Sequence, residues 1–112
     1  MGQFKERQSR IAELNDALRC NGEGGEIFVT RSLHAMGPAF VARALALVRA
    51  LDRFEPDNDP YCEHDFGVVR VEGDTVYFKI DYYDREKAGA SPDPSNPSVT
   101  TRVMTLMLAD DY

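Results

Sequence analysis

The sequence lacks the features that mark exported and membrane-spanning proteins. Its two cysteines, Cys20 and Cys62, allow one disulfide at most, and a single pair without an export signal is more often two free thiols. The longest apolar stretch, residues 40–51, is interrupted by Arg43 and Arg49 and is shorter than the ~20 residues that span a bilayer. The beginning, MGQFKERQSR, is charged where a secretory signal needs an apolar run. We therefore expect a cytoplasmic protein without a membrane partner.

Recognised catalytic motifs are also absent. An enzyme would use His64 as a general base oriented by Asp81 or Asp65, with Tyr83 or Lys79 stabilising charge. However, no serine or cysteine stands at a recognised nucleophile spacing from His64. A small hydrolase-like enzyme is therefore kept as an alternative, and the default interpretation of His64 is a strand-end histidine that is hydrogen-bonded to a carboxylate.

A metal site is weakly indicated by an acidic loop. The residues that could surround a cation are Asp57, Asp59, Glu63, His64 and Asp65. An EF-hand is excluded, because Cys62 stands where its loop requires glycine. Turns stabilised by Asp and Asn side chains explain this loop more simply, so no metal and no cofactor is predicted.

The net charge of −6 is unevenly distributed along the chain. Residues 1–50 contain seven Lys/Arg and five Asp/Glu, a balance of +2, whereas residues 51–112 contain six and fourteen, a balance of −8. An acidic surface disfavours direct binding to nucleic acid or anionic lipid and favours cationic partners. Ordinary solubilising charge is the alternative explanation.

Helices and a short strand are predicted in the first half of the chain. Over residues 4–20, apolar residues recur with helical spacing, at Phe4, Ile11, Leu14 and Leu18. Residues 26–30 follow a glycine-rich turn and predict a strand. A second helix begins at Pro38, and its apolar side chains fall within an arc of about 140°; they are Phe40, Val41, Ala44, Leu47, Val48, Leu51 and Phe54.

The second half predicts a hairpin, an irregular loop and a last strand. Residues 66–72 and 75–83 flank a two-residue turn at Gly73-Asp74, residues 84–98 form the loop, and residues 99–108 form a strand covered on both faces. The predicted fold is a single α+β domain over residues 1–112, a small mainly antiparallel sheet with two helices packed on one face. Its predicted core contains Phe40, Leu47, Val48, Leu51, Val69, Phe78 and Ile80.

The hairpin also predicts a mixed polar and aromatic sheet face. Side chains alternate across a strand, so the residues that do not face the helices share the opposite face. With the predicted turn, the cross-strand pairs on that face are His64 with Tyr83, Phe66 with Asp81, Val68 with Lys79 and Arg70 with Tyr77. Tyr and Arg are enriched at protein interfaces, so this face is a predicted protein-binding surface.

Four blocks of the sequence resemble a bacterial family known as domain of unknown function 3768. They are NDPYCEHDFG (58–67), KIDYYD (79–84), SPDPSNPS (91–98) and TTRVMTLMLADDY (100–112), and the resemblance extends from about residue 14 to the last residue. Phe78 stands where the family usually has tryptophan. The resemblance implies a context of plasmids and other mobile elements of proteobacteria, and with it a role in protecting mobile DNA from host defences.

Together these patterns favour a non-catalytic protein-binding module, most specifically an anti-defence inhibitor of the anti-CRISPR or antirestriction type. Its partner would be a protein with a basic surface, such as a nuclease or a CRISPR or restriction complex, toward which carboxylates can imitate phosphates. The predicted binding residues are Asp57, Asp59, Glu63, His64, Asp65, Lys79, Asp81 and Tyr83. An accessory subunit or a homodimer without inhibitory role remains an alternative.

Overall fold

The computed structural model describes residues 2–112, with side chains from residue 5 onward, so the predicted apolar position Phe4 lies outside the described side chains. In chain order the elements are α1 (Gly2–Asn21), β1 (Glu26–Val29), α2 (Arg31–His34), α3 (Pro38–Ala50), β2 (Phe66–Val71), β3 (Asp74–Tyr83), the 3₁₀ turn η1 (Pro97–Val99), β4 (Thr101–Leu108) and the 3₁₀ turn η2 (Ala109–Asp111). The two predicted helices and four predicted strands are therefore confirmed, and α2 is an additional short helix.

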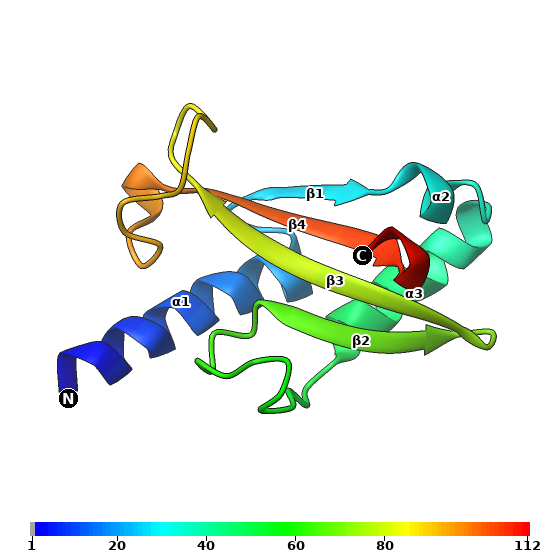
Figure 1. Cartoon of the computed structure of the whole chain (residues 1–112), viewed down its shortest axis with the longest axis horizontal. Coiled ribbons are helices and arrows are strands. Elements are labelled where there is room, and N and C mark those ends of the chain that lie inside the picture. Colours follow the sequence, from blue (N-terminus) through cyan, green and yellow to red (C-terminus); the bar gives the residue numbers. More distant parts are fainter. Residues whose placement is uncertain (1) are drawn as a thin grey trace.

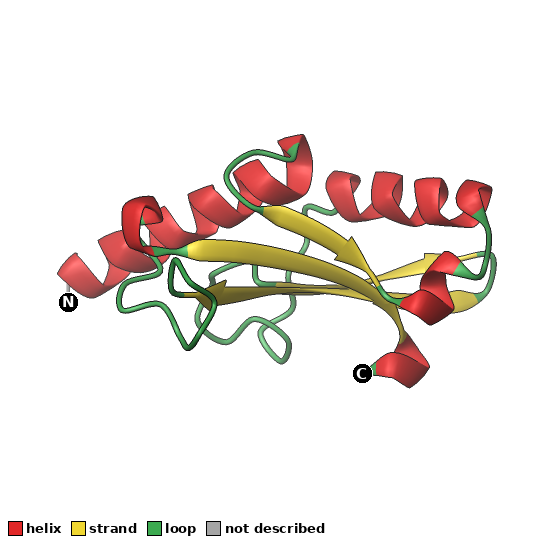
Figure 2. Ribbon diagram, turned by 90° about the horizontal axis from the view of Figure 1, so that it is seen from above, coloured by secondary structure: helices red, strands yellow, loops and turns green. Residues whose placement is uncertain are grey.

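The four strands form one mixed sheet in the order β1-β4-β3-β2. The pair β1 and β4 is parallel, whereas β4 with β3 and β3 with β2 are antiparallel. Figure 1 looks onto the sheet with α1 and α3 behind it, and Figure 2 shows both helices on the same side of the strands. The predicted α+β class, with two helices on one face of a mainly antiparallel sheet, is confirmed.

The hairpin turn lies one residue earlier than the sequence predicts. Glu72 and Gly73 occupy the turn with φ angles of 50° and 89°, as expected where both turn residues adopt left-handed conformations. Val71 therefore pairs with Asp74, and each β2 residue pairs with a β3 residue two positions before the predicted one. Because the shift is two residues, every side chain of the strand pair keeps its predicted face.

The hydrophobic core lies between the sheet and the two long helices. Phe40, Val48, Val69, Phe78 and Ile80 are buried in it as predicted, whereas Leu47 and Leu51 are only partly buried against it. At Gly67, a Cβ atom would overlap the Phe78 ring and the Leu51 side chain, which explains why this strand position has no side chain. Further core residues come from α1, α2 and the strands: Leu18, Leu33, Val71, Val76, Met104 and Leu106.

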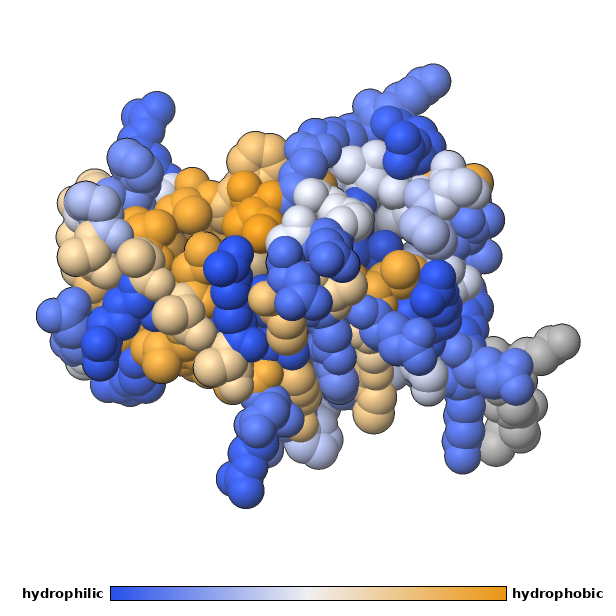
Figure 3. All heavy atoms as spheres, turned by 180° about the vertical axis from the view of Figure 1, so that it is seen from behind, coloured by the Kyte–Doolittle hydropathy of each residue, from blue (hydrophilic) through white to orange (hydrophobic). Residues whose placement is uncertain are grey.

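The outer side of the helix layer is mixed in character. Figure 3 views this side and shows hydrophobic residues exposed between long hydrophilic side chains. Ala42, Arg43, Ala46 and Arg49 of α3 are exposed. None of the helices in the described part of the chain is both long and apolar enough to span a membrane.

Candidate functional site

The face of the sheet that α1 and α3 leave uncovered carries aromatic and charged side chains. In β3, Val76, Phe78 and Ile80 point to the core, so the alternating residues Tyr77, Lys79, Asp81 and Tyr83 share the opposite face. Their neighbours across β2 include Phe66, which pairs with Lys79, and Val68, which pairs with Tyr77. The predicted placement of Lys79, Asp81 and Tyr83 on this open face is confirmed.

Three aromatic rings cluster at one end of the open face. The ring centroids of Phe66, Tyr77 and Tyr112 lie 5.3 to 5.4 Å apart in all three pairs, within the range of favourable aromatic contacts. The ring of Tyr112 is nevertheless exposed, at 71%. The cluster therefore leaves aromatic surface exposed to solvent as well as packing against itself.

One carboxylate holds the η2 turn against the segment that follows β1. Asp111 accepts hydrogen bonds from the hydroxyls of Thr30 and Ser32, at 2.8 and 2.5 Å, and from the backbone N–H of Leu108, at 3.0 Å. The two hydroxyl donors lower the pKa of Asp111 below its usual value, which keeps the carboxylate ionised. These contacts fix the segment that leads to Tyr112 beside the sheet.

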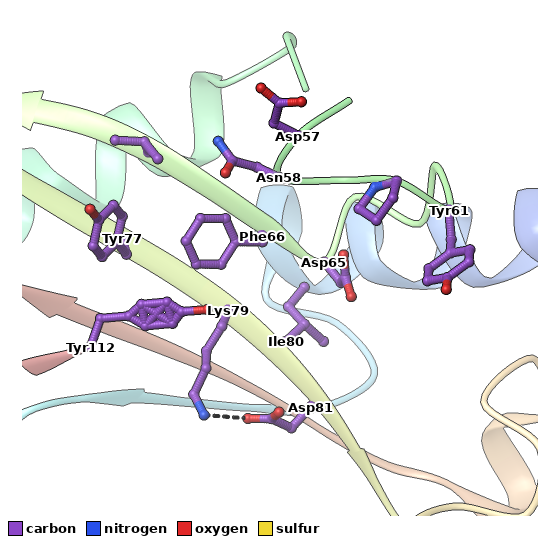
Figure 4. A pocket seen from close by; sticks show the side chains of 12 residues that line it. Asp57, Asn58, Tyr61, Asp65, Phe66, Tyr77, Lys79, Ile80, Asp81 and Tyr112 are labelled. Atoms are coloured by element: carbon purple, nitrogen blue, oxygen red, sulfur yellow. Dashed lines mark ion pairs between the residues drawn. The ribbon is translucent and has the colours of Figure 1, made fainter. Parts of the chain in front are cut away.

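A groove of about 710 Å³ runs along this face between the hairpin and the loop before it. Besides the three rings, its lining includes Asp57, Tyr61, Asp65, Lys79 and Asp81. Figure 4 shows Phe66, Tyr77 and Tyr112 at one part of the groove and Asp65 and Tyr61 at another. Lys79 and Asp81 form an ion pair with an N–O distance of 3.1 Å. Three carboxylates thus share the groove with one lysine and four aromatic rings.

One carboxylate of the groove is a stronger base than usual. Burial, together with the charges of Glu63, Asp59 and Asp81, raises the pKa of Asp65 from 3.8 to about 6. A carboxylate in such surroundings gains from a nearby cation, because a positive charge relieves the repulsion between neighbouring negative groups.

The prediction that Asp59 belongs to an acidic binding surface is wrong, because its side chain is buried inside its own loop. Its side chain is only 4% exposed. Its two oxygens accept the backbone N–H groups of Glu63 and His64, at 2.8 and 3.1 Å. The carboxylate stabilises the turn that leads into β2, whereas Asp57 in the same loop is exposed and lines the groove.

The predicted position of His64 on the open sheet face is wrong. His64 precedes β2 and has a φ of 57°, so strand alternation does not extend to it. Its ring stacks on Phe54 with a centroid distance of 4.2 Å, and its Nδ1 lies 3.0 Å from an Asp16 oxygen. The histidine thus lies on the helix side of the sheet, where it contacts a carboxylate as its default interpretation expected, although Asp16 is neither of the two predicted partners.

Glu63 belongs to a buried polar network that joins α1 to the sheet. Asn15 is fully buried, and its amide donates to the Tyr82 hydroxyl at 2.8 Å and to the Glu63 carbonyl at 2.9 Å. The Tyr82 hydroxyl donates to the Glu63 carboxylate at 2.8 Å, and burial raises the pKa of Tyr82. Arg102 donates to Asn15 at 2.7 Å and to the Pro94 carbonyl, with its guanidinium 5.2 Å from the Tyr82 ring centroid.

A second buried arginine anchors the end of α3. Arg19 donates to the carbonyls of Val48 and Leu51, at 2.8 and 2.7 Å, and to Asp16 at 3.0 Å. Its guanidinium lies 5.1 Å from the Phe54 ring centroid. Both arginines therefore combine hydrogen bonds with aromatic contact, and sequence analysis did not identify either as buried.

Of the predicted binding residues, the structure brings Asp57, Asp65, Lys79 and Asp81 together in the groove. Tyr83 lies further along the same face and bridges to Ala90, and Asp59, Glu63 and His64 are engaged elsewhere. Sequence reasoning missed Tyr61 and Tyr112, because no periodic pattern links a loop or a final turn to a strand. Tyr77 was placed on the correct face but was not counted as a binding residue.

Within the described residues, no group of three or more His, Cys, Asp or Glu side chains is arranged to hold a metal ion. The acidic loop that suggested such a site separates its members: Asp59 faces inward, and His64 contacts α1. The two cysteines are free and exposed.

One protein family, described as Protein of unknown function (DUF3768), matches residues 29–111 of the 112-residue chain. The chain belongs to this family. The resemblance inferred from the sequence is thereby confirmed, although the match begins later than the expected start near residue 14. The matched region contains every groove residue except Tyr112. No curated protein and no solved structure matches the chain.

Proposed function

We propose that the protein is a non-catalytic binding module that docks a basic protein surface on its open sheet face. The observation that carries this proposal is the groove in which exposed aromatic rings lie beside Asp57, Asp65 and Asp81. Aromatic side chains anchor protein interfaces, and complementary charge steers the encounter. The −8 balance of residues 51–112 supplies that charge.

A catalytic role is the weaker alternative because of how His64 is engaged. A general base must reach a substrate proton, whereas the ring of His64 is stacked on Phe54 and directed at Asp16. Of the residues that the enzyme alternative places beside the histidine, Lys79, Asp81 and Tyr83 lie on the opposite face of the sheet.

The more specific form of the proposal is an anti-defence inhibitor of the anti-CRISPR or antirestriction type. Two arguments support it: the mobile-element context that we expect from the sequence resemblance, and an acidic surface suited to a basic nucleic-acid channel, where carboxylates can take the place of phosphates. The partner is then a nuclease or a CRISPR or restriction complex in the cytoplasm, and inhibition is stoichiometric.

The proposal is tested by affinity capture from a host that carries these defence systems. The wild type is compared with the groove variant Tyr77→Ala/Asp81→Asn and with the control Glu13→Gln, which removes an exposed charge from the helix side. We expect the wild type and the control to retain one basic partner and the groove variant to lose it, with nuclease activity falling in proportion to inhibitor added. Equal capture by the groove variant would contradict the proposal, as would substrate turnover abolished by His64→Ala.

A further inference from the structure

We propose that the groove is an arginine-binding site in which a guanidinium of the partner lies against the Phe66, Tyr77 and Tyr112 rings and donates hydrogen bonds to the groove carboxylates. This inference rests on the proposed binding function and specifies the partner's chemistry. Arginine is chosen over lysine because of the exposed rings, the carboxylates that line the groove and the ion pair between Lys79 and Asp81.

The aromatic cluster suits a flat cation. Its rings are in mutual contact, with interplanar angles of 34° to 68°, so ring surface is presented in several directions. Tyr112 and Tyr61 are 71% and 63% exposed. A guanidinium is planar and weakly hydrated, and it stacks on aromatic rings more readily than an ammonium group does.

The carboxylates suit a group with several fixed donors. Asp57, Asp65 and Asp81 come from the loop before β2 and from β3 and line one groove, so two segments of the chain supply acceptors to it. A guanidinium has five N–H donors in a rigid fork and can bond two oxygens at once. The raised pKa of Asp65 favours a cation of either kind, because an arriving positive charge stabilises the ionised form of this carboxylate.

Lys79 favours a guanidinium over an ammonium group as the cation bound in the groove. Its ammonium nitrogen is paired with Asp81 at 3.1 Å within the groove, so an incoming cation must compete with it for that carboxylate. A guanidinium that stacks on the rings keeps that contact while Asp81 stays paired with Lys79, whereas an ammonium group depends more on the carboxylate for its binding. Removal of the Lys79 charge should therefore tighten binding of a cationic partner, and it should weaken binding of an acidic one.

Two arginines of the chain itself are already bound by an aromatic ring together with hydrogen-bond acceptors. Arg19 lies 5.1 Å from the Phe54 centroid and bonds Asp16, and Arg102 lies 5.2 Å from the Tyr82 centroid and bonds Asn15. These interior sites show that ring contact plus oxygen acceptors is a stable arrangement for guanidinium groups on this scaffold.

The test is a titration of the ¹⁵N-labelled protein with nona-arginine and with nona-lysine, which carry equal charge. We expect arginine to bind more tightly by about two- to fivefold, the size of a cation–π preference at an exposed site, with amide shifts concentrated at Tyr77, Lys79 and Asp81. Lys79→Met should tighten nona-arginine binding, Tyr77→Ala should abolish the arginine preference, and Glu13→Gln should change neither.

The outcomes separate this inference from the function on which it rests. Equal affinity for the two peptides, with shifts at the groove, would overturn the arginine site and leave a groove that binds basic surfaces. Weaker nona-arginine binding by Lys79→Met would also overturn it. Absence of groove shifts with either peptide would overturn both proposals.

Discussion

The two sides of the sheet combine aromatic rings with polar groups in opposite ways. On the helix side, the rings of Phe54 and Tyr82 contact the buried arginines Arg19 and Arg102, whose donors meet carbonyls, Asp16 or Asn15. On the open side, aromatic rings and three carboxylates line a groove whose only cation among the described lining residues is Lys79. The helix side thus contains its own cations, which stabilises the fold. The open side has an excess of acceptors, which favours a cation from outside.

The largest difference between the two sides should appear when a phenylalanine is truncated on each. Phe78→Ala removes a fully buried ring from the core and should lower the free energy of unfolding by about 3–5 kcal/mol. Phe66→Ala on the partly exposed face should cost no more than about 1–2 kcal/mol, because less apolar area returns to water. Urea denaturation measures both, and equal losses would contradict the assignment of the two faces.

The buried arginines should matter almost as much as the core. Arg102→Met removes the donors to Asn15 and the Pro94 carbonyl and leaves buried acceptors unpaired, so we expect a loss of about 2–3 kcal/mol. Arg85→Met, at an exposed position, is the matched control and should change stability by less than about 0.5 kcal/mol. If the two variants have equal melting temperatures, the helix side does not depend on its buried arginines for stability.

The strand and helix pattern was predictable because each element is governed by local periodicity. Apolar and polar side chains alternate regularly along residues 66–83, so the residues of the open face were predicted correctly. The turn was nevertheless placed one residue too late, and the cross-strand pairs were shifted by two residues. The helix from Pro38 was also identified, but its predicted core extended to Leu47 and Leu51, which the sheet covers only in part.

The interior polar network and the aromatic cluster were not predictable because they depend on contacts between distant segments. Asn15 donates hydrogen bonds to Glu63 and Tyr82, which lie 48 and 67 positions further along the sequence. Tyr112 reaches Phe66 and Tyr77 through a turn held by Asp111. His64 was misplaced because strand alternation was extended past the start of β2 into a residue with a left-handed backbone.

The two aspartates of the acidic loop should respond differently to the same change. Asp59→Ala removes the acceptor of two backbone N–H groups and should lower the free energy of unfolding by about 1–2 kcal/mol. Asp57→Ala, at an exposed groove position, should leave stability within about 0.5 kcal/mol and instead slow association with a basic partner. Thermal melts and association rates at two salt concentrations distinguish the effects; a destabilised Asp57→Ala with normal association would reverse these roles.

The smallest effect concerns Asp65, and its sign follows from the direction of its pKa shift. Folding raises this pKa from 3.8 to about 6, first by burial and then through Glu63, Asp59 and Asp81. The folded state therefore holds the proton more tightly, so this stabilising contribution is complete below about pH 4 and is lost as the pH rises through about 6.

Asp65→Asn removes that titration and should make the protein more stable at pH 7 by on the order of 1 kcal/mol, a value reduced for the solvent that reaches the groove. Between about pH 4 and 6, the variant should lose less stability than the wild type as the pH rises. Urea midpoints across this range check the prediction, with Asp57→Asn as the matched control, which should retain the wild-type slope. The same Asp65→Asn variant should bind nona-arginine more weakly at pH 7, because the carboxylate that destabilises the isolated fold is one that receives the incoming cation. A variant that is both less stable and tighter in binding would show that Asp65 is a structural residue and that the groove uses its other carboxylates.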